Sequence, residues 1–153
     1  YNNFLNQIKK TYGLDFCQAC SKLTGQDVTI EMHHGPIFTL YDICEVVLQK
    51  FIKTGYKINT LRIADVVLQE HFDLNVQIVM LAVTFHEAVH NKDMFLNLKQ
   101  GFGDSAAFIE KYGAYLEDNQ KYKIWNYINL SKGNDSFDRG ILDVDKVRAM
   151  VKM

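Results

Sequence analysis

The sequence is poor in cysteine and proline, and it has no long hydrophobic run. Three cysteines among 153 residues exclude a disulfide-stabilised scaffold and favour a reducing, intracellular setting. No apolar run approaches the roughly 18 residues of a membrane-spanning helix, so we expect no membrane partner. A single proline and the lack of low-complexity stretches predict one domain over residues 1–153. Because the chain begins at Tyr1 rather than Met, we expect an N-terminal piece to be missing, and the chain could be part of a larger protein or complex.

Arginine is also scarce, and the charges nearly cancel. The chain has 17 basic and 18 acidic residues, which gives a formal net charge of -1 at pH 7. Arginine is the residue that reads guanine edges with two hydrogen bonds, and only Arg62, Arg139 and Arg148 are present. The composition therefore excludes a generally basic nucleic-acid-binding surface and leaves only local patches for such contacts. Lys92 and Lys99 are candidates for contacts to phosphates, although lysines of this kind also suit a solvated face.

The apolar pattern predicts an α+β fold that is mostly helical. Residues 27–32 alternate and are β-prone, which predicts a strand, whereas residues 76–83 are a continuous apolar run that suits a strand or a helix. Thr84 and Glu87 have the spacing of a capping box, which predicts a helix that begins at Thr84. Apolar spacing, Asp104 as a cap and a capping box at Thr39 predict further helices over about 2–12, 40–53, 60–71, 104–117, 119–131 and 142–152.

Several side chains on these predicted helices are assigned to the core or to the surface by their spacing alone. The aromatic residues Tyr41, Phe51, Phe108 and Trp125 lie at helical spacing and are expected in the core, as is Cys44. His71 lies near a helix end without a recognisable partner, so we expect it on the surface.

Four histidines form two pairs that suit a metal site. His86 and His90 are four residues apart, so on a helix they project from one face and can bind one ion between them. His33 and His34 follow the predicted strand, where neighbouring side chains point to opposite faces. One of these two would bind the metal, and the other is free to act as a base.

This pattern resembles the HNH, or ββα-metal, nucleases over about residues 14–95. In that family a strand ends in a His-His or Asp-His pair after a CxxC motif, and a second strand leads into a helix that carries the last histidines. The run from Gln77 to His90 is similar to that second strand and metal helix. The resemblance implies a small β-hairpin-plus-helix metal core, surrounded by several helices and followed by a helical part over about 102–153.

The resemblance also implies the function and the role of each histidine. His33, His86 and His90 would bind one divalent ion, Mg²⁺, Mn²⁺ or Zn²⁺, and His34 would be the general base. Such a site is expected to hydrolyse phosphodiester bonds in DNA, since the ion neutralises charge that grows on the phosphate. Compact nucleases of this kind occur in phages and mobile elements, which places the chain in the cytoplasm of a bacterial cell or a phage-infected host.

The sequence departs from the family pattern at three points. Gln77 stands where the family has an Asn that braces the loop of the catalytic histidine. Cys17 and Cys20 match the first CxxC pair, but Ala82 and Phe85 stand where a second pair would be. The two cysteines are therefore either half of a structural zinc site or core-filling residues. Finally, the segment over 35–76 is longer than the family loop and is expected to hold two inserted helices.

Two other functions fit parts of the same pattern. His86-Glu87-Ala-Val-His90 is a literal HExxH motif, so a zinc metalloprotease could use Glu87 as its base and Glu110 as its third ligand. A helix start at Thr84 and the lack of a role for His33 and His34 weigh against it, but one continuous helix over 73–92 would favour it. The third hypothesis is a non-catalytic, metal-stabilised module that binds DNA or protein.

Overall fold

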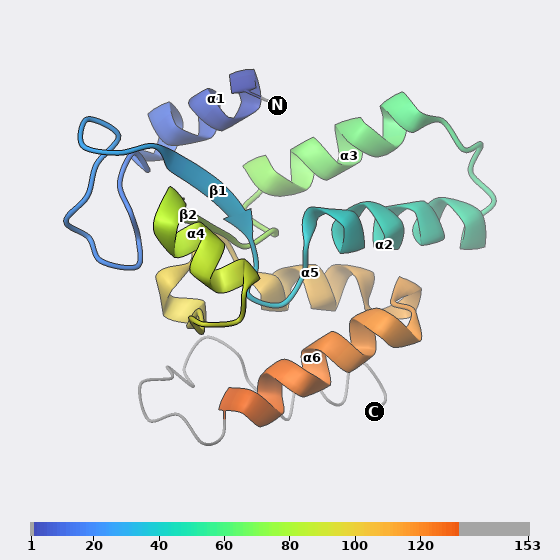
Figure 1. Ribbon diagram of the computed structural model, residues 1–153. Coiled ribbons are helices and arrows are strands. Elements are labelled where there is room, and N and C mark those ends of the chain that lie inside the picture. The colour runs from blue at the N-terminus through green and yellow to red at the C-terminus, as the bar shows by residue number, and fades with distance from the viewer. Residues whose placement is uncertain (1, 132–153) are drawn as a thin grey trace.

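A two-stranded antiparallel sheet forms the middle of the fold, and helices surround it in the computed structural model (Figure 1). The structure describes residues 2–131, so the helix predicted over 142–152 lies outside the described residues. The fold class is the predicted one, α+β with a small β-hairpin-plus-helix core surrounded by helices. The elements in chain order are α1 (Asn2–Tyr12), β1 (Ile30–His34), α2 (Leu40–Lys53), α3 (Thr60–Phe72), β2 (Ile78–Ala82), α4 (Val83–His90), η1 (Leu98–Gln100), α5 (Ser105–Tyr112), η2 (Gly113–Tyr115) and α6 (Asp118–Ser131).

The pairing of β1 with β2 shows that both segments next to the histidines are strands. The strands are antiparallel, with Ile30 opposite Ala82 and His33 opposite Val79. All five residues of β2 are buried, which explains why its apolar run has no periodicity that separates a strand from a helix. β1 alternates instead, so Glu31 and His33 share one face of the hairpin and His34 lies on the other.

The starts of α2 and α5 follow the predicted capping residues, and α3 begins with a similar cap. Thr39 and Asp42 form the complete capping box of α2, and Asp42 also binds the ammonium of Lys123 in α6 at 2.6 Å. Asn59 caps α3 and Asp104 caps α5 through side-chain oxygens that accept backbone N–H bonds. The predicted starts of these helices are therefore close to the observed ones, although the helix predicted over 104–117 ends at Tyr112. α2 and α6 are held together by a buried carboxylate.

α4 begins differently from its prediction. β2 continues directly into this helix, whose N-cap position is Ala82 and has no side-chain hydrogen bond. The capping box predicted at Thr84 and Glu87 is wrong, because the helix already includes Val83 and Thr84 lies inside its first turn. None of the eight residues of α4 is fully buried. The helix that carries His86 and His90 is therefore short, uncapped and loosely packed.

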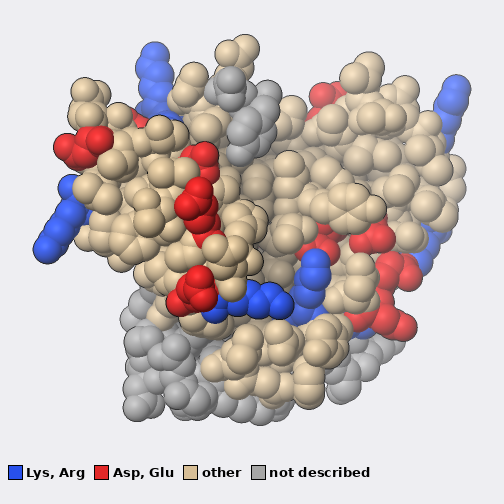
Figure 2. Space-filling view, viewed as in Figure 1, with Lys and Arg blue, Asp and Glu red and all other residues tan. Residues whose placement is uncertain are grey.

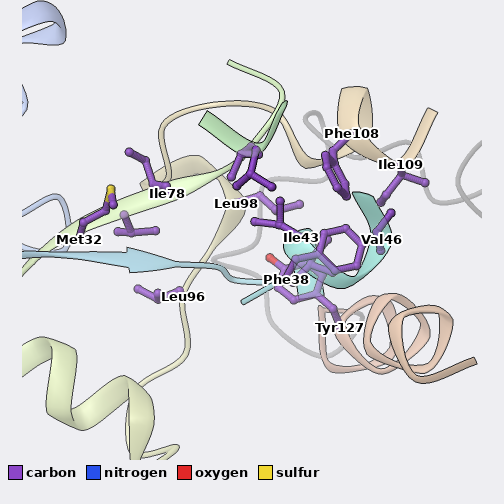
Figure 3. Packing of buried hydrophobic residues seen from close by; sticks show 14 of the residues in the cluster. Met32, Phe38, Ile43, Val46, Ile78, Leu96, Leu98, Phe108, Ile109 and Tyr127 are labelled. Atoms are coloured by element: carbon purple, nitrogen blue, oxygen red, sulfur yellow. The ribbon is translucent and has the colours of Figure 1, made fainter. Parts of the chain in front are cut away.

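The hydrophobic core lies between the sheet and α2, α5 and α6 (Figure 3). Phe51 and Phe108 belong to it as predicted. The prediction is wrong for Tyr41 and Trp125, which are 78% and 44% exposed. Helical spacing shows which residues lie on the same face of a helix, but it does not show whether other elements cover that face. Within the described residues, no helix is long and apolar enough to cross a membrane.

Candidate metal centre

Three of the four candidate histidines converge on one point. One ring nitrogen from each of His33, His86 and His90 lies within 4.8 Å of the other two. The two Nε2 atoms of His86 and His90 are 3.0 Å apart. The ring centroid of His33 lies 5.1 Å from that of His90 and 5.2 Å from that of His86. Among residues 2–131, this is the one group of three or more potential metal ligands at such distances.

The local folding of two segments produces this convergence. The alternation of β1 turns His33 toward α4, and the spacing of four residues places His86 and His90 on the same face of that helix. Gly35 has no side chain, and this leaves room for the ring of His33. A Cβ atom at this position would lie 2.9 Å from Nε2 of His33, so any larger residue would push the ring from its place.

Glu31 orients one of the three rings, and sequence analysis did not identify it. Its carboxylate accepts a hydrogen bond from Nδ1 of His86. This bond fixes the tautomer in which Nε2 of His86 carries the free lone pair, which is how carboxylates commonly support metal-binding histidines. The signal in the sequence was its position two residues before His33, because residues two apart on a strand share a face.

The three rings differ in exposure, and this affects their charge. His33 and His86 are half-buried and His90 is exposed, so an ion can enter from solvent. Burial, followed by the proximity of His86 and then of His90, lowers the pKa of His33 from 6.5 to about 4. His33 is therefore neutral at physiological pH, which is the form that binds a metal.

His34 does not join this group, and its predicted role as general base is not supported by its position. It lies on the opposite face of β1, where its Nε2 is 2.9 Å from Nε2 of His71. Burial, then the proximity of His71 and of His33, lowers its pKa to about 3. A ring with that pKa is a weak base at neutral pH, and its partner occupies the nitrogen that would take the proton.

His71 is the partner that sequence analysis placed wrongly on the surface. Its side chain is buried, with 4% of the residue exposed, and its Nδ1 donates to the carbonyl of Val67 at 2.6 Å. The edge of Phe4 from α1 packs on the ring, with centroids 5.1 Å apart. Burial lowers the pKa of His71 against the opposing effects of the Val67 carbonyl and Glu70. The pair of His34 and His71 is therefore a buried contact between β1 and α3.

Gln77 is structural in this fold. Its side chain is buried, where Nε2 donates to the carbonyl of Leu98 at 2.7 Å and Oε1 accepts from Ser105 at 2.9 Å. Only its backbone carbonyl reaches the loop after the histidine pair, through the N–H of Gly35 at 3.4 Å. The side chain therefore braces the segment before α5 and not the loop of His34, so the catalytic assignment of Gln77 is corrected.

The cysteines and lysines do not add to the centre. Cys17 is buried and Cys20 is half-buried, and among the described residues no third ligand joins them, as a zinc site would require. Lys92 is exposed just after α4, whereas the side chain of Lys99 in η1 lies outside what the structure describes. Figure 2 shows basic and acidic side chains in small separate groups over the viewed face, without a continuous basic surface among the described residues. DNA binding stays a prediction.

The HExxH interpretation fails on geometry. β2 ends at Ala82, so the continuous helix over 73–92 that would favour a metalloprotease does not form. The third residue that joins His86 and His90 is His33, and the group does not include Glu110. Glu87 points outward as an exposed residue of α4.

Comparison with known proteins identifies the family of the chain. A family model described as bacteriophage G278-like virion protein matches residues 1–152. No curated protein and no solved structure matches the chain significantly. The predicted function of DNA endonuclease is wrong, because the matching family is one of virion proteins and not of nucleases, while the association with phages is correct. Since the match spans nearly the whole sequence, the chain belongs to the bacteriophage G278-like virion protein family.

Proposed function

We propose that this protein is a component of the phage particle in which His33, His86 and His90 bind one divalent transition metal ion. The family description supports the location. The convergence of three ring nitrogens from β1 and α4 is the observation that carries the metal site. The ion would join the β hairpin to α4 and hold that part of the surface in one conformation.

The donor set favours Zn²⁺ over the other ions considered. Imidazole nitrogens suit zinc and other transition metals, whereas Mg²⁺ prefers oxygen ligands and keeps several waters. The centre offers three imidazoles, and the carboxylate of Glu31 is engaged with Nδ1 of His86. Three protein ligands also leave a fourth tetrahedral position open for water or another molecule.

A structural role for the ion follows from the weakness of α4. Isolated helices shorter than about 12 residues are marginal in water, and α4 has eight residues without a side-chain cap or a fully buried residue. Metal bonds from His86 and His90 to an ion also bound by His33 would tie both turns of this helix to β1. The free energy of metal binding then becomes stability of the fold.

Thermal unfolding of the chelator-treated protein with added Zn²⁺ tests the site. At a free ion concentration 100 times Kd, binding stabilises the folded state by about 2.7 kcal/mol. For a chain of this size we therefore expect Tm to rise by roughly 5–10 °C, with no comparable rise for Mg²⁺. His90→Ala should remove the rise, and Glu87→Gln, an exposed change on the same helix, should keep it. An equal rise in the His90→Ala variant contradicts the proposal.

Glu31→Gln tests the orientation of His86. The amide still accepts a hydrogen bond, but it lacks the charge that strengthens the bond from Nδ1. We expect the affinity for Zn²⁺ to fall about 10- to 100-fold, as for other residues that support a metal ligand. Competition with a chromophoric chelator measures this, with Glu87→Gln as the matched control. If both variants retain the native affinity, Glu31 does not orient the site.

A further inference from the structure

A pocket opens beside the three histidines and shares one of them. Its volume is about 460 Å³, and it lies between the end of α4, the loop that follows and the C-terminal half of α6. Figure 1 shows that this loop passes between the two helices. His33 is part of its wall, so an ion held by His33 would lie at the edge of the pocket.

Most of the wall is apolar. Leu96 is buried, whereas Phe95 and Leu130 are partly exposed, and Leu130 has 55% of its surface open to solvent. Ligand pockets typically measure about 300–1,000 Å³ and combine apolar walls with a few polar groups. The polar groups here are His33, Lys92 and Asn126. The wall therefore suits a molecule with an apolar body and a polar or charged head.

Among the described residues that line the pocket, Lys92 is the one that carries a charge, and its backbone conformation is unusual. It has a φ of +64°, the left-handed conformation that glycine commonly supplies just after a helix. A residue with a Cβ atom is disfavoured there, and such outliers gather at functional sites. The conformation places a long cationic side chain at the end of α4, on the rim of the pocket.

We infer that this pocket binds an amphipathic anion whose oxyanion head, a carboxylate or a phosphate, occupies the open position of the ion at His33, His86 and His90. The inference rests on the proposed metal site. The ion and the ammonium of Lys92 attract the head group, and Phe95, Leu96 and Leu130 surround the apolar body. Asn126 is a further hydrogen-bonding group in the same wall.

Calorimetry with octanoate and octyl phosphate on the Zn²⁺-loaded protein tests the inference. Acetate carries the head alone and should bind at least about tenfold more weakly than octanoate, because burial of two methylenes already accounts for about tenfold. Octanol carries the tail alone and should also bind about tenfold more weakly, because it lacks the charge that the ion and Lys92 attract. Stronger binding by octanoate or by octyl phosphate distinguishes a carboxylate from a phosphate head. In the Co²⁺-loaded protein, the bound head group should change the visible absorption spectrum of the ion.

Two variants separate the pocket from the metal site. Lys92→Gln should weaken octanoate binding about tenfold, which is the loss expected for one charge-assisted hydrogen bond. Leu130→Asn should weaken it by a similar factor because the tail loses an apolar contact. Both variants should bind Zn²⁺ with the native affinity, since neither residue belongs to the group of ligands.

The outcomes that overturn the inference differ from a failure of the metal site. Equal affinity of acetate and octanoate, or octanoate binding that is the same with and without Zn²⁺, contradicts it while the metal site stands. An unchanged Co²⁺ spectrum on binding of octanoate also contradicts it. If the native protein binds no Zn²⁺ in the chelator competition, the proposed function itself has failed.

Discussion

Replacement of Glu70 by alanine is expected to lower the free energy of unfolding by about 2–3 kcal/mol, because it leaves buried hydrogen-bond donors without their charged acceptor. The residue is 3% exposed, and its carboxylate accepts hydrogen bonds from Lys111 at 2.6 Å and from Tyr112 and Asn75 at 2.7 Å. Burial works to raise the pKa of Glu70, but these three donors outweigh it and hold the pKa below the ordinary value. Without the carboxylate, the hydroxyl of the buried Tyr112 loses its acceptor.

Chemical denaturation measures this loss, and a matched change shows that it comes from burial. Glu117 forms an ion pair with Lys53 at 3.0 Å in which both side chains are more than 40% exposed. Glu117→Ala should therefore cost at most about 1 kcal/mol. Glu70→Gln should fall between the two, because it keeps an acceptor but loses the charge. If the losses for Glu70→Ala and Glu117→Ala are equal, this network does not hold α3 to α5.

Acid is expected to destabilise the protein from about pH 6.5 downward, through His34 and His71, whose pKa values are both lowered in the folded protein. The pKa of His71 lies below the ordinary value of 6.5 because burial disfavours the charged ring, and this effect outweighs those of the Val67 carbonyl and Glu70, which act in the opposite direction. Below pH 6.5 the unfolded chain therefore binds more protons than the folded chain, and the free energy of unfolding falls with pH. Each unit of difference between the two pKa values contributes about 1.4 kcal/mol.

Denaturation curves between pH 7.5 and 5 in the presence of EDTA measure this dependence without bound metal. The double variant His34→Phe/His71→Leu replaces both rings by apolar side chains and should flatten the curve over this range. His33 remains in both proteins, so the difference between the two slopes reports the buried pair. Equal slopes contradict the assignment. Below about pH 4.5, protonation of carboxylates such as Glu70 and Asp42, whose pKa values are lowered, should reduce stability in both proteins.

The parts of the fold that local chemistry determines could be predicted from the sequence. The capping box at Thr39, the cap at Asp104 and the alternation of residues 27–32 each act within a few residues, and each element formed near its predicted position. The start of α4 could not be predicted in this way. Its position depends on the pairing of β2 with β1, which is a contact between distant segments and overrides the capping pattern at Thr84.

The same distinction applies to the site. Spacing identified His86, His90 and one of His33 and His34, because strand and helix geometry dictate which side chains share a face. The resemblance to the HNH nucleases then selected His33 over His34. The partners of His34 and His86 could not be found this way. His71 lies 37 residues from His34, and Glu31 lies 55 residues from His86, so both contacts depend on how the elements pack. The contact between Nε2 of His34 and His71 is also the reason why the position of His34 does not support a role as general base.

For the proposed component of a phage particle, the proposed metal site would have a physical advantage over more packing. α4 has no fully buried residue, so an ion bound by His33, His86 and His90 would fix this surface without a larger hydrophobic interior. Removal of the ion would then release α4 and leave the network around Glu70 intact.

X-ray absorption at the zinc edge of the protein loaded with one equivalent of Zn²⁺ tests the central claim most directly. We predict one ion per chain with three imidazole nitrogens at about 2.0 Å and one further light ligand. His86→Ala should lose this spectrum. A sulfur ligand at about 2.3 Å, which would indicate Cys17 or Cys20, or an ion that stays unbound, would contradict the three-histidine centre.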